Sequence, residues 1–241
     1  MTEQDSNEDS VDNSVSVTRH KIIFVGDAGV GKTTIISRIM DNPFNEVYEP
    51  SIGVDFMSKN IKFRGQSVKL QMWDTAGQEK YKGLIPSYVR NSSIVFLVYD
   101  ISSKITFDNI PKWITFIRTI ENTTLVLCGN KTDLSDRQVK KEEGETLAQK
   151  EGIQFFEVSA KTDDNIKNMF YNVVVELPTF AENNANKEVL IELMQENGVE
   201  YVAEGIQPNE LKQAPATKIN VDGKEKIVEQ PDSKKKKKCG C

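Results

Sequence analysis

The stretch GDAGVGKT, residues 26–33, directly follows the apolar run IIFV and opens a segment of helical character. It fits the pattern G-x-x-x-x-G-K-[ST] in the strand-to-helix context that this pattern requires. Glycines let successive backbone N–H groups turn toward a phosphate, and the start of the helix adds partial positive charge. Lys32 is expected to reach the β- and γ-phosphates, and Thr33 to offer a hydroxyl to Mg²⁺. The expected phosphate-binding residues are Gly26, Asp27, Ala28, Gly29, Val30, Gly31, Lys32, Thr33 and Thr34.

The phosphate loop by itself does not identify the reaction, because kinases, ATPases and GTPases share it. A second motif, GNKTD, closes the apolar run TLVLC, and ligands of parallel sheets lie beyond the carboxyl ends of strands. Asp133 can accept hydrogen bonds from the N1–H and the exocyclic amine of guanine, a donor pair that adenine lacks. Asn130 is expected to hold the loops together, and the aliphatic part of Lys131 to cover one face of the base.

A third motif, VSAK, ends the next apolar run and supplies Ser159, Ala160 and Lys161. The Ala160 N–H is expected to donate to the guanine carbonyl. Taken alone, NKTD fits any polar turn, and VSAK fits a turn before a helix. Their order after the phosphate loop, each at the end of a strand, favours a guanine nucleotide site.

The motif WDTAGQE, residues 73–79, carries the groups that would act on the terminal phosphate. Asp74 ends a strand and can hold Mg²⁺ through water, and the Gly77 N–H can sense the γ-phosphate. Gln78 is expected to orient the attacking water, because phosphoryl transfer is catalysed mostly by positioning and charge stabilisation. The single histidine, His20, stands at the start of a strand and is expected to be structural.

Short β-rich apolar runs alternate with stretches of helical character at residues 32–40, 106–120, 139–151 and 165–177. This alternation predicts an α/β fold with a parallel sheet covered by helices on both faces. The runs VDFMSKNIKF and VKLQMWD are separated only by RGQS, which favours an antiparallel hairpin. Trp113 falls on the apolar face of the second helical stretch and is expected to be core or half-buried, without another role.

The chain has 241 residues, 38% hydrophobic and 28% charged, with a net charge of -5, which is typical of one soluble globular domain with tails. We expect an acidic, disordered arm at residues 1–18, a folded domain at 19–178 and a flexible tail at 179–241 with at most a short helix near 187–195. No secretion signal opens the sequence and no apolar run could span a membrane, which favours the cytosol. Cys128 is expected to be a small buried hydrophobe.

The motifs GDAGVGKT, SIGVDF, WDTAGQE, GNKTD and SAK, in this order across residues 19–178, resemble those of a small GTPase of the Ras superfamily, specifically its Rab branch. The resemblance implies a P-loop NTPase fold: a six-stranded, mostly parallel sheet with one antiparallel strand, flanked by five helices. It also implies hydrolysis of GTP to GDP and phosphate with Mg²⁺, slow without an activating protein, and two nucleotide-sensing loops at residues 44–57 and 75–90.

The resemblance assigns further residues to these loops. It implies that Phe44 stacks on guanine, Tyr48 closes over the phosphates and Ser51 ligates Mg²⁺ in the GTP state. Ser51 departs from the usual threonine, keeping the hydroxyl and losing the methyl group. The aromatic triad through which Rab proteins present their active face to effectors matches Phe56, Trp73 and Tyr88, although these side chains would also suit a core.

Within the branch, LIPSYVRNS, EEGE and the LP after the last helical stretch are most similar to the Golgi-associated Rab subgroup numbered six. This likeness implies a switch in vesicle trafficking, Golgi-linked and retrograde, at the cytoplasmic face of membranes and cycling with the cytosol. The segment QEKYKG and Ala28 depart from that subgroup. The implied partners are an exchange factor, a GTPase-activating protein, an escort or GDI-type carrier and effectors, with no nucleic acid.

The stretch KKKKKCGC places Cys239 and Cys241 next to five lysines in an otherwise acidic chain. It resembles the double-prenylation signal of Rab proteins, since one lipid chain anchors only marginally and basic charge near an anionic leaflet adds attraction. A basic run with idle thiols is the alternative. For the whole chain, the alternative to a GTP-hydrolysing switch is a membrane-tethered scaffold that binds guanine nucleotide with little or no turnover.

Overall fold

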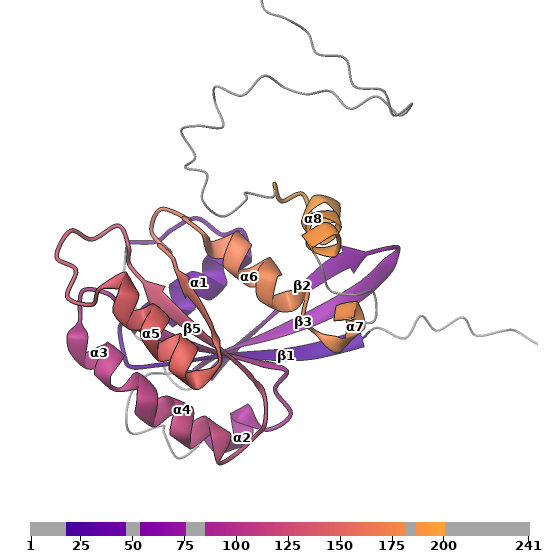
Figure 1. Cartoon of the computed structure of the whole chain (residues 1–241). Helices are drawn as coiled ribbons and strands as arrows, with labels where there is room; N and C mark the ends of the chain where they lie inside the picture. Colours follow the sequence, from indigo (N-terminus) through magenta and orange to yellow (C-terminus); the bar gives the residue numbers. More distant parts are fainter. Residues whose placement is uncertain (1–17, 47–53, 76–84, 182–186, 201–241) are drawn as a thin grey trace, which may run out of the picture. The chain divides into compact units, whose positions relative to one another are not determined.

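A computed structural model of the chain describes residues 18–46, 54–75, 85–181 and 187–200. Its centre is a six-stranded sheet in the order β2-β3-β1-β4-β5-β6 (Figure 1). Strand β2 runs antiparallel to β3, and every other neighbouring pair is parallel, so the predicted sheet is confirmed. The strands are β1 Thr18–Val25, β2 Val54–Phe63, β3 Gln66–Thr75, β4 Ile94–Asp100, β5 Thr124–Asn130 and β6 Gln154–Glu157.

Eight helices lie in the described part of the chain: α1 Lys32–Ile39, α2 Ile85–Val89, α3 Lys104–Asp108, α4 Ile110–Arg118, α5 Lys141–Glu151, α6 Ile166–Val174, α7 Pro178–Ala181 and α8 Lys187–Glu196. The resemblance implies five helices. Four of them correspond to α1, α2, α5 and α6, and the remaining one corresponds to α3 and α4 together. The stretch of helical character predicted at residues 106–120 is present, but it is divided at Asn109 into α3 and α4. Pro111 has no N–H to donate to the carbonyl of Phe107, so the hydrogen-bond ladder breaks there.

The central strands β4 and β5 are buried on both faces and are largely apolar, whereas β3 alternates between buried and partly exposed residues. All seven residues of β4 are buried. Along β1, Ile22 and Phe24 face a core cluster formed with α1, α6, α7 and α8, whereas Ile23 and Val25 face a second cluster formed with α2, α3, α4 and α5. The helices thus form one layer on each side of the sheet (Figure 1).

The β2–β3 hairpin turns at Arg64 and Gly65, which have φ values of 49° and 76°. Two central residues with positive φ match the twist of the flanking strands and make the tight turn that such hairpins favour. The pairing continues from Phe63 opposite Gln66 to Val54 opposite Thr75. The hairpin therefore joins the two stretches expected to sense the nucleotide, one before β2 and one after β3.

Helix α8 packs against the rest of the folded domain, although residues 179–241 are expected from the sequence to form a flexible tail. It contacts β2 and α6, and its apolar side chains belong to the same core cluster as α1. Leu193 is fully buried and Met194 is 1% exposed. A short helix near residues 187–195 is present, and its apolar face explains why it is held on the sheet rather than in solvent.

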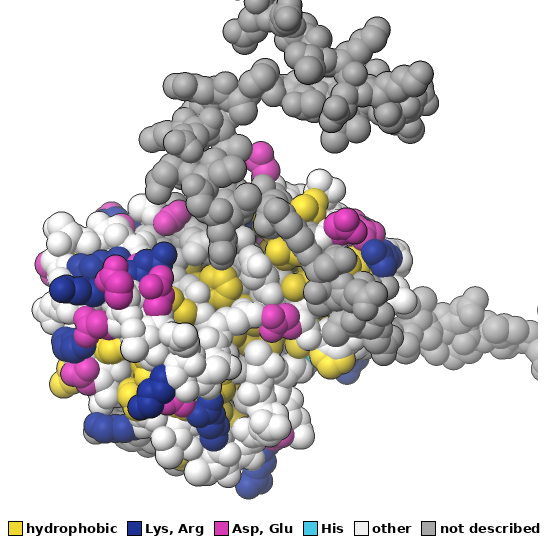
Figure 2. All heavy atoms as spheres, in the orientation of Figure 1, with side chains coloured by type: hydrophobic (Ala, Val, Ile, Leu, Met, Phe, Trp, Pro, Cys, Tyr) yellow, Lys and Arg dark blue, Asp and Glu magenta, His cyan; other side chains and the backbone are white. Residues whose placement is uncertain are grey.

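Charged side chains of opposite sign are interspersed over the α3–α5 side of the molecule (Figure 2). The ion pairs there include Lys104 with Glu143 and Arg137 with Glu157. None of the helices in the described ranges combines the length and apolar character that crossing a membrane requires.

Candidate functional site

The phosphate loop, residues 26–33, lies between the carboxyl end of β1 and the start of α1, and two of its glycines are required by their surroundings. Gly26 has a φ of 144°, and a Cβ there would lie 2.1 Å from the carbonyl oxygen of Val98. Gly31 has a φ of 96°, and its Cβ would lie 2.3 Å from Nδ2 of Asn130. Any side chain at either position would push the loop away from the neighbouring strand ends.

Lys32 is only 5% exposed, and its ammonium is held inside the phosphate loop. Nζ donates to the carbonyl oxygen of Gly26 at 3.0 Å and to that of Asp27 at 2.8 Å. Burial lowers the pKa of Lys32 to about 8, partly offset by the negative charges of Asp74 and Asp27. A buried cation surrounded mainly by carbonyls is suited to an anionic ligand, because a phosphate would restore the favourable charge balance.

Thr33 and Asp74 meet at the end of the loop, where Oγ1 of Thr33 donates to Oδ2 of Asp74 at 2.6 Å. Asp74 is 1% exposed and stands near the end of β3. A hydroxyl and a carboxylate side by side are oxygen ligands of the kind that Mg²⁺ takes together with substrate phosphates and water. Thr33 and Asp74 are the described residues that would hold the ion beside a nucleotide. No group of three or more His, Cys, Asp and Glu side chains suited to a metal occurs in the described ranges.

Asn130, at the end of β5, ties two loops to each other. Its Nδ2 donates to the carbonyl oxygen of Val30 at 2.9 Å, and its Oδ1 accepts from the backbone N–H of Ala160 at 3.1 Å. The side chain is 2% exposed, so these bonds replace water that cannot reach the groups. The Ala160 N–H, expected to face a guanine carbonyl, is directed to Asn130 in this structure.

The remaining residues of the expected base-binding region lie next to this amide. Oδ1 of Asp133 accepts a hydrogen bond of 2.6 Å from the buried hydroxyl of Ser159, which orients an otherwise exposed carboxylate. Lys131 has a φ of 72°, and its Nζ lies 2.6 Å from Oδ2 of Asp100. The ion pair fixes the far end of the Lys131 side chain, so its aliphatic part is held in one place.

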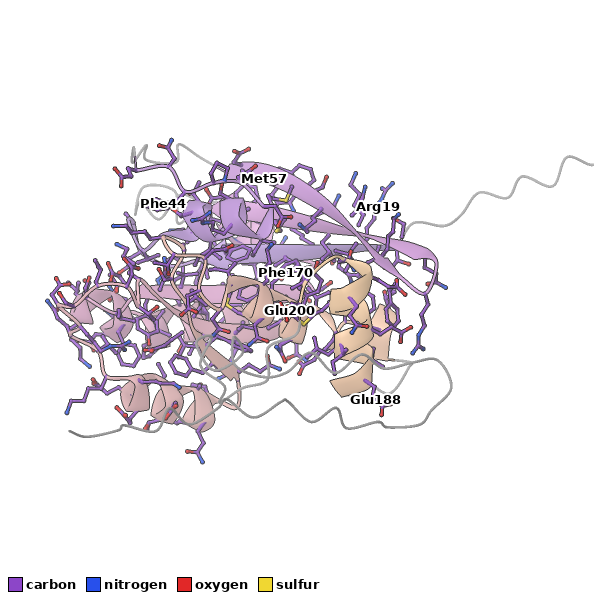
Figure 3. All side chains as sticks on the ribbon, turned by 90° about the horizontal axis from the view of Figure 1, so that it is seen from above. Arg19, Phe44, Met57, Phe170, Glu188 and Glu200 are labelled. Carbon is purple, nitrogen blue, oxygen red and sulfur yellow. The ribbon has the colours of Figure 1, made fainter. Side chains whose placement is uncertain are left out.

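Arg38 belongs to this site, although the sequence analysis does not identify it. From the last turn of α1, it donates to the carbonyl oxygens of Ala160 at 2.8 Å and Lys161 at 2.7 Å. Its guanidinium carbon lies 6.0 Å from the centre of the Phe44 ring. Figure 3 shows Phe44 at the end of the sheet away from Arg19, where β1 begins. Phe44 thus lies at the same end of the sheet as the phosphate loop.

Asp27 connects the phosphate loop to α4. Its Oδ2 accepts from Nδ2 of Asn109 at 2.7 Å, and its Oδ1 accepts from Nε1 of Trp113 at 3.2 Å. Trp113 is 6% exposed, so the expected burial is correct. The interpretation that Trp113 has no other role is wrong, because its indole N–H reaches the phosphate loop.

The three aromatic side chains expected to meet effectors form one row. The rings of Phe56 and Trp73 are 5.3 Å apart, and those of Trp73 and Tyr88 are 5.8 Å apart. Trp73 and Tyr88 are partly buried against the α4 side of the sheet, but Phe56 is 45% exposed. The exposed Phe56 does not fit the alternative that all three residues are core.

His20 and Cys128, which belong to none of the nucleotide-binding motifs, are both buried. His20 is 7% exposed, and its ring nitrogens lie within hydrogen-bond distance of Ser93 Oγ and Thr179 Oγ1. Burial lowers the pKa of His20. Cys128 is fully buried, and burial raises the pKa of its thiol, so the thiolate that would react is disfavoured.

Several expected site residues lie outside the described ranges, and the structure does not place them: Tyr48, Ser51, Gly77, Gln78, Cys239 and Cys241. The described ones gather where β1, β3 and β5 end and where the VSAK stretch follows β6. In a comparison with models of protein families, residues 21–179 match the model described as "Ras family". This match spans the phosphate loop, Asp74 and both expected base-binding motifs.

Proposed function

The chain belongs to the Ras family of small GTPases, which are nucleotide-dependent switches, and from this premise we propose that it is a Rab-type switch of intracellular vesicle trafficking. The proposal includes a Golgi-linked, retrograde route, supported by LIPSYVRNS and EEGE in the sequence. Members of the family bind GTP or GDP and usually Mg²⁺, and they generally work with exchange factors, activating proteins and effectors.

One observation carries the proposal that the bound base is guanine. Asn130 joins Val30 of the phosphate loop to Ala160 of the VSAK motif, while Ser159 orients the Asp133 carboxylate beside it. These hydrogen bonds therefore join the phosphate loop to the loop proposed to bind the base. A carboxylate at the base position selects a ligand with two adjacent donors, which guanine has.

We propose that Lys32 binds the β- and γ-phosphates, that Thr33 and Asp74 hold Mg²⁺ and that Gln78 orients the attacking water. The ion would neutralise charge on the phosphates, and the side chains would position them. For Ras, an activating protein raises the rate by about 10⁵-fold, so we expect a partner to supply an arginine here. Single-turnover hydrolysis of radiolabelled GTP by the wild type and by Gln78→Leu tests this step.

We expect Gln78→Leu to hydrolyse GTP more slowly than the wild type, with unchanged GDP affinity. Equal rates would remove Gln78 from the catalytic residues. A wild type that binds GTP but does not hydrolyse it, even with a Rab-type activating protein present, would instead favour the scaffold.

We also propose that Cys239 and Cys241 carry lipids and that the neighbouring lysines attract anionic lipids of the cytoplasmic leaflet. Two attached lipid chains anchor a protein stably to a membrane, whereas a single lipid chain binds it only marginally. An escort or GDI-type carrier would then be required in the cytosol. Replacing both cysteines by serine should leave GTP binding intact and move the protein from Golgi membranes to the cytosol in cells. Membrane retention of that variant would contradict lipid anchoring.

A further inference from the structure

The carboxylate of Asp27 places a negative charge in a loop that is proposed to bind phosphate. It belongs to the second residue of the loop, next to the space where an anionic ligand is proposed to bind. An unpaired carboxylate there would repel phosphate and would compete with it for the nearby ammonium of Lys32. The structure instead directs this carboxylate away from the loop, toward α4.

Two donors from one helix turn hold the carboxylate. Nδ2 of Asn109 donates to one oxygen at 2.7 Å, and Nε1 of Trp113 donates to the other at 3.2 Å. The two residues are four positions apart, so they stand on the same face of α4, one turn above the other. Each carboxylate oxygen therefore has its own donor.

Asn109 is not engaged in capping the helix on which it stands. It occupies the N-cap position of α4 but makes no side-chain cap hydrogen bond. Its φ of −82° and ψ of −16° are helical, whereas a side chain that caps a helix stands on an extended residue. Here its amide nitrogen donates to Asp27, while its Oδ1 accepts from Lys112 at 3.0 Å. The Asn109 amide therefore links α4 to the phosphate loop.

The same loop residue also holds the lysine. The carbonyl oxygen of Asp27 accepts from Nζ of Lys32 at 2.8 Å, and the negative charge of Asp27 acts on that ammonium. A continuous set of hydrogen bonds thus runs from α4 through the side chain and backbone of Asp27 to Lys32. If Asn109 or Trp113 lost its donor, the Asp27 carboxylate would be free to turn toward the ammonium.

We propose that Asn109 and Trp113 are positioning residues for nucleotide binding: they hold Asp27 away from the phosphates and thereby keep Lys32 available to them. The inference rests on the proposed binding of guanine nucleotide. Both residues act through Asp27, the loop residue to which their side chains donate. The residues that influence phosphate binding therefore include two at the beginning of α4.

Dissociation of tritiated GDP from the full chain, with Mg²⁺ present, tests the proposal. Trp113→Phe keeps the aromatic packing and removes the donor, and Asn109→Ala removes the other donor. Each should release GDP about tenfold faster than the wild type, because a hydrogen bond to a charged acceptor has this order of effect. Thr115→Ala, on the exposed face of α4, is the matched control and should release GDP at the wild-type rate.

A double-mutant cycle separates positioning from general damage to the fold. With Asp27→Ala in the background, Trp113→Phe and Asn109→Ala should have no further effect, because the carboxylate that they hold is gone. The Asp27→Ala/Trp113→Phe double variant should release GDP more slowly than Trp113→Phe alone. A purely structural role would leave the tenfold acceleration unchanged in both backgrounds.

The outcomes distinguish this inference from the proposed function. If the wild type does not bind GDP, the proposed function fails. If it binds GDP and the variants release it at the wild-type rate, or if Asp27→Ala fails to suppress their effects, the positioning role is contradicted while the proposed function stands. Asn109 is only partly buried, so its cycle remains informative if Trp113→Phe folds poorly.

Discussion

The side-chain amide of Asn130 donates to the carbonyl oxygen of Val30 across 2.9 Å, although the two residues are 100 positions apart in the chain. The same side chain accepts from the N–H of Ala160. Because Asn130 is almost fully buried, its side chain takes the place of water at both backbone groups. Together with Arg38, which joins α1 to the carbonyl oxygens of Ala160 and Lys161, this residue sets the relative placement of the phosphate-binding and base-binding elements.

We therefore expect Asn130→Ala to be destabilising. It leaves the Val30 carbonyl and the Ala160 N–H buried without a partner, at a cost of about 1–3 kcal/mol each. Urea unfolding with GDP in excess measures the change. Asn122→Ala, at an exposed position, is the control and should leave the unfolding midpoint unchanged. Equal midpoints for Asn130→Ala and the wild type would mean that the loops are held together by other contacts.

The lowered pKa of Lys32 predicts that nucleotide binding depends on pH. In the free protein the ammonium loses its proton as pH rises through about 8, whereas a bound phosphate favours the charged form. GDP affinity should therefore fall between pH 7.5 and about 9, with a limiting slope of about tenfold per pH unit. Calorimetric titrations across this range measure the effect, and Lys32→Ala should bind more weakly with a flatter profile.

The sign of the stability change follows from the same shift. The folded-state pKa of Lys32 lies below the ordinary value of 10.5, so burial destabilises the nucleotide-free protein fully below pH 8. This penalty is relieved as pH rises from about 8 to 10.5, where the unfolded chain binds more protons. A GDP affinity that stays constant from pH 7.5 to 9 would contradict a titrating Lys32 in the free site.

Sequence patterns predict the parts of this protein whose function is set locally. The phosphate loop, the β2–β3 hairpin and the motif at Asn130 each combine a chain conformation and a chemical group within a few residues. Arg38 has no such signal, because its partners are carbonyls of the VSAK loop, and carbonyls are present at every position. The hydrogen bond from Trp113 to Asp27 could not be predicted, because Trp113 lies on the apolar face of its helix and that position alone explains its burial.

The packing of α8 against the domain could not be predicted from the sequence, and the reason is physical. Residues 179–200 contain only short runs of apolar residues between polar ones, and this overall polar composition is typical of a flexible tail. What decides the outcome is the apolar surface that β2 and α6 present, and this surface depends on the tertiary fold. Local composition is a weak guide wherever a neighbouring element provides the buried area.

We expect the docked α8 to contribute to the stability of the folded unit. Leu193 is fully buried, so Leu193→Ala should lower the free energy of unfolding by about 2–5 kcal/mol. Glu188→Ala, at an exposed position of the same helix, is the matched control and should change little. Chemical denaturation of the two variants, both loaded with GDP, gives the comparison.

The ion pair between Arg64 and Glu192 tests which contacts hold α8. Its two side chains are 45% and 39% exposed, so solvent screens their attraction. Arg64→Ala should destabilise the protein much less than Leu193→Ala. The reverse order would mean that charge at the hairpin turn, and not apolar burial, fixes the helix.

The central claim is that the phosphate loop and the Asn130–Asp133 motif together form a site for guanine nucleotide. The most direct measurement is calorimetric titration of nucleotide-free protein with GDP, IDP and ADP in the presence of Mg²⁺. We predict the tightest binding for GDP, weaker binding for IDP, which lacks the exocyclic amine that Asp133 would accept from, and no measurable heat with ADP. Asp133→Ala should bind GDP and IDP alike. Absence of heat with GDP, or equal affinity of the wild type for GDP and ADP, would contradict the claim.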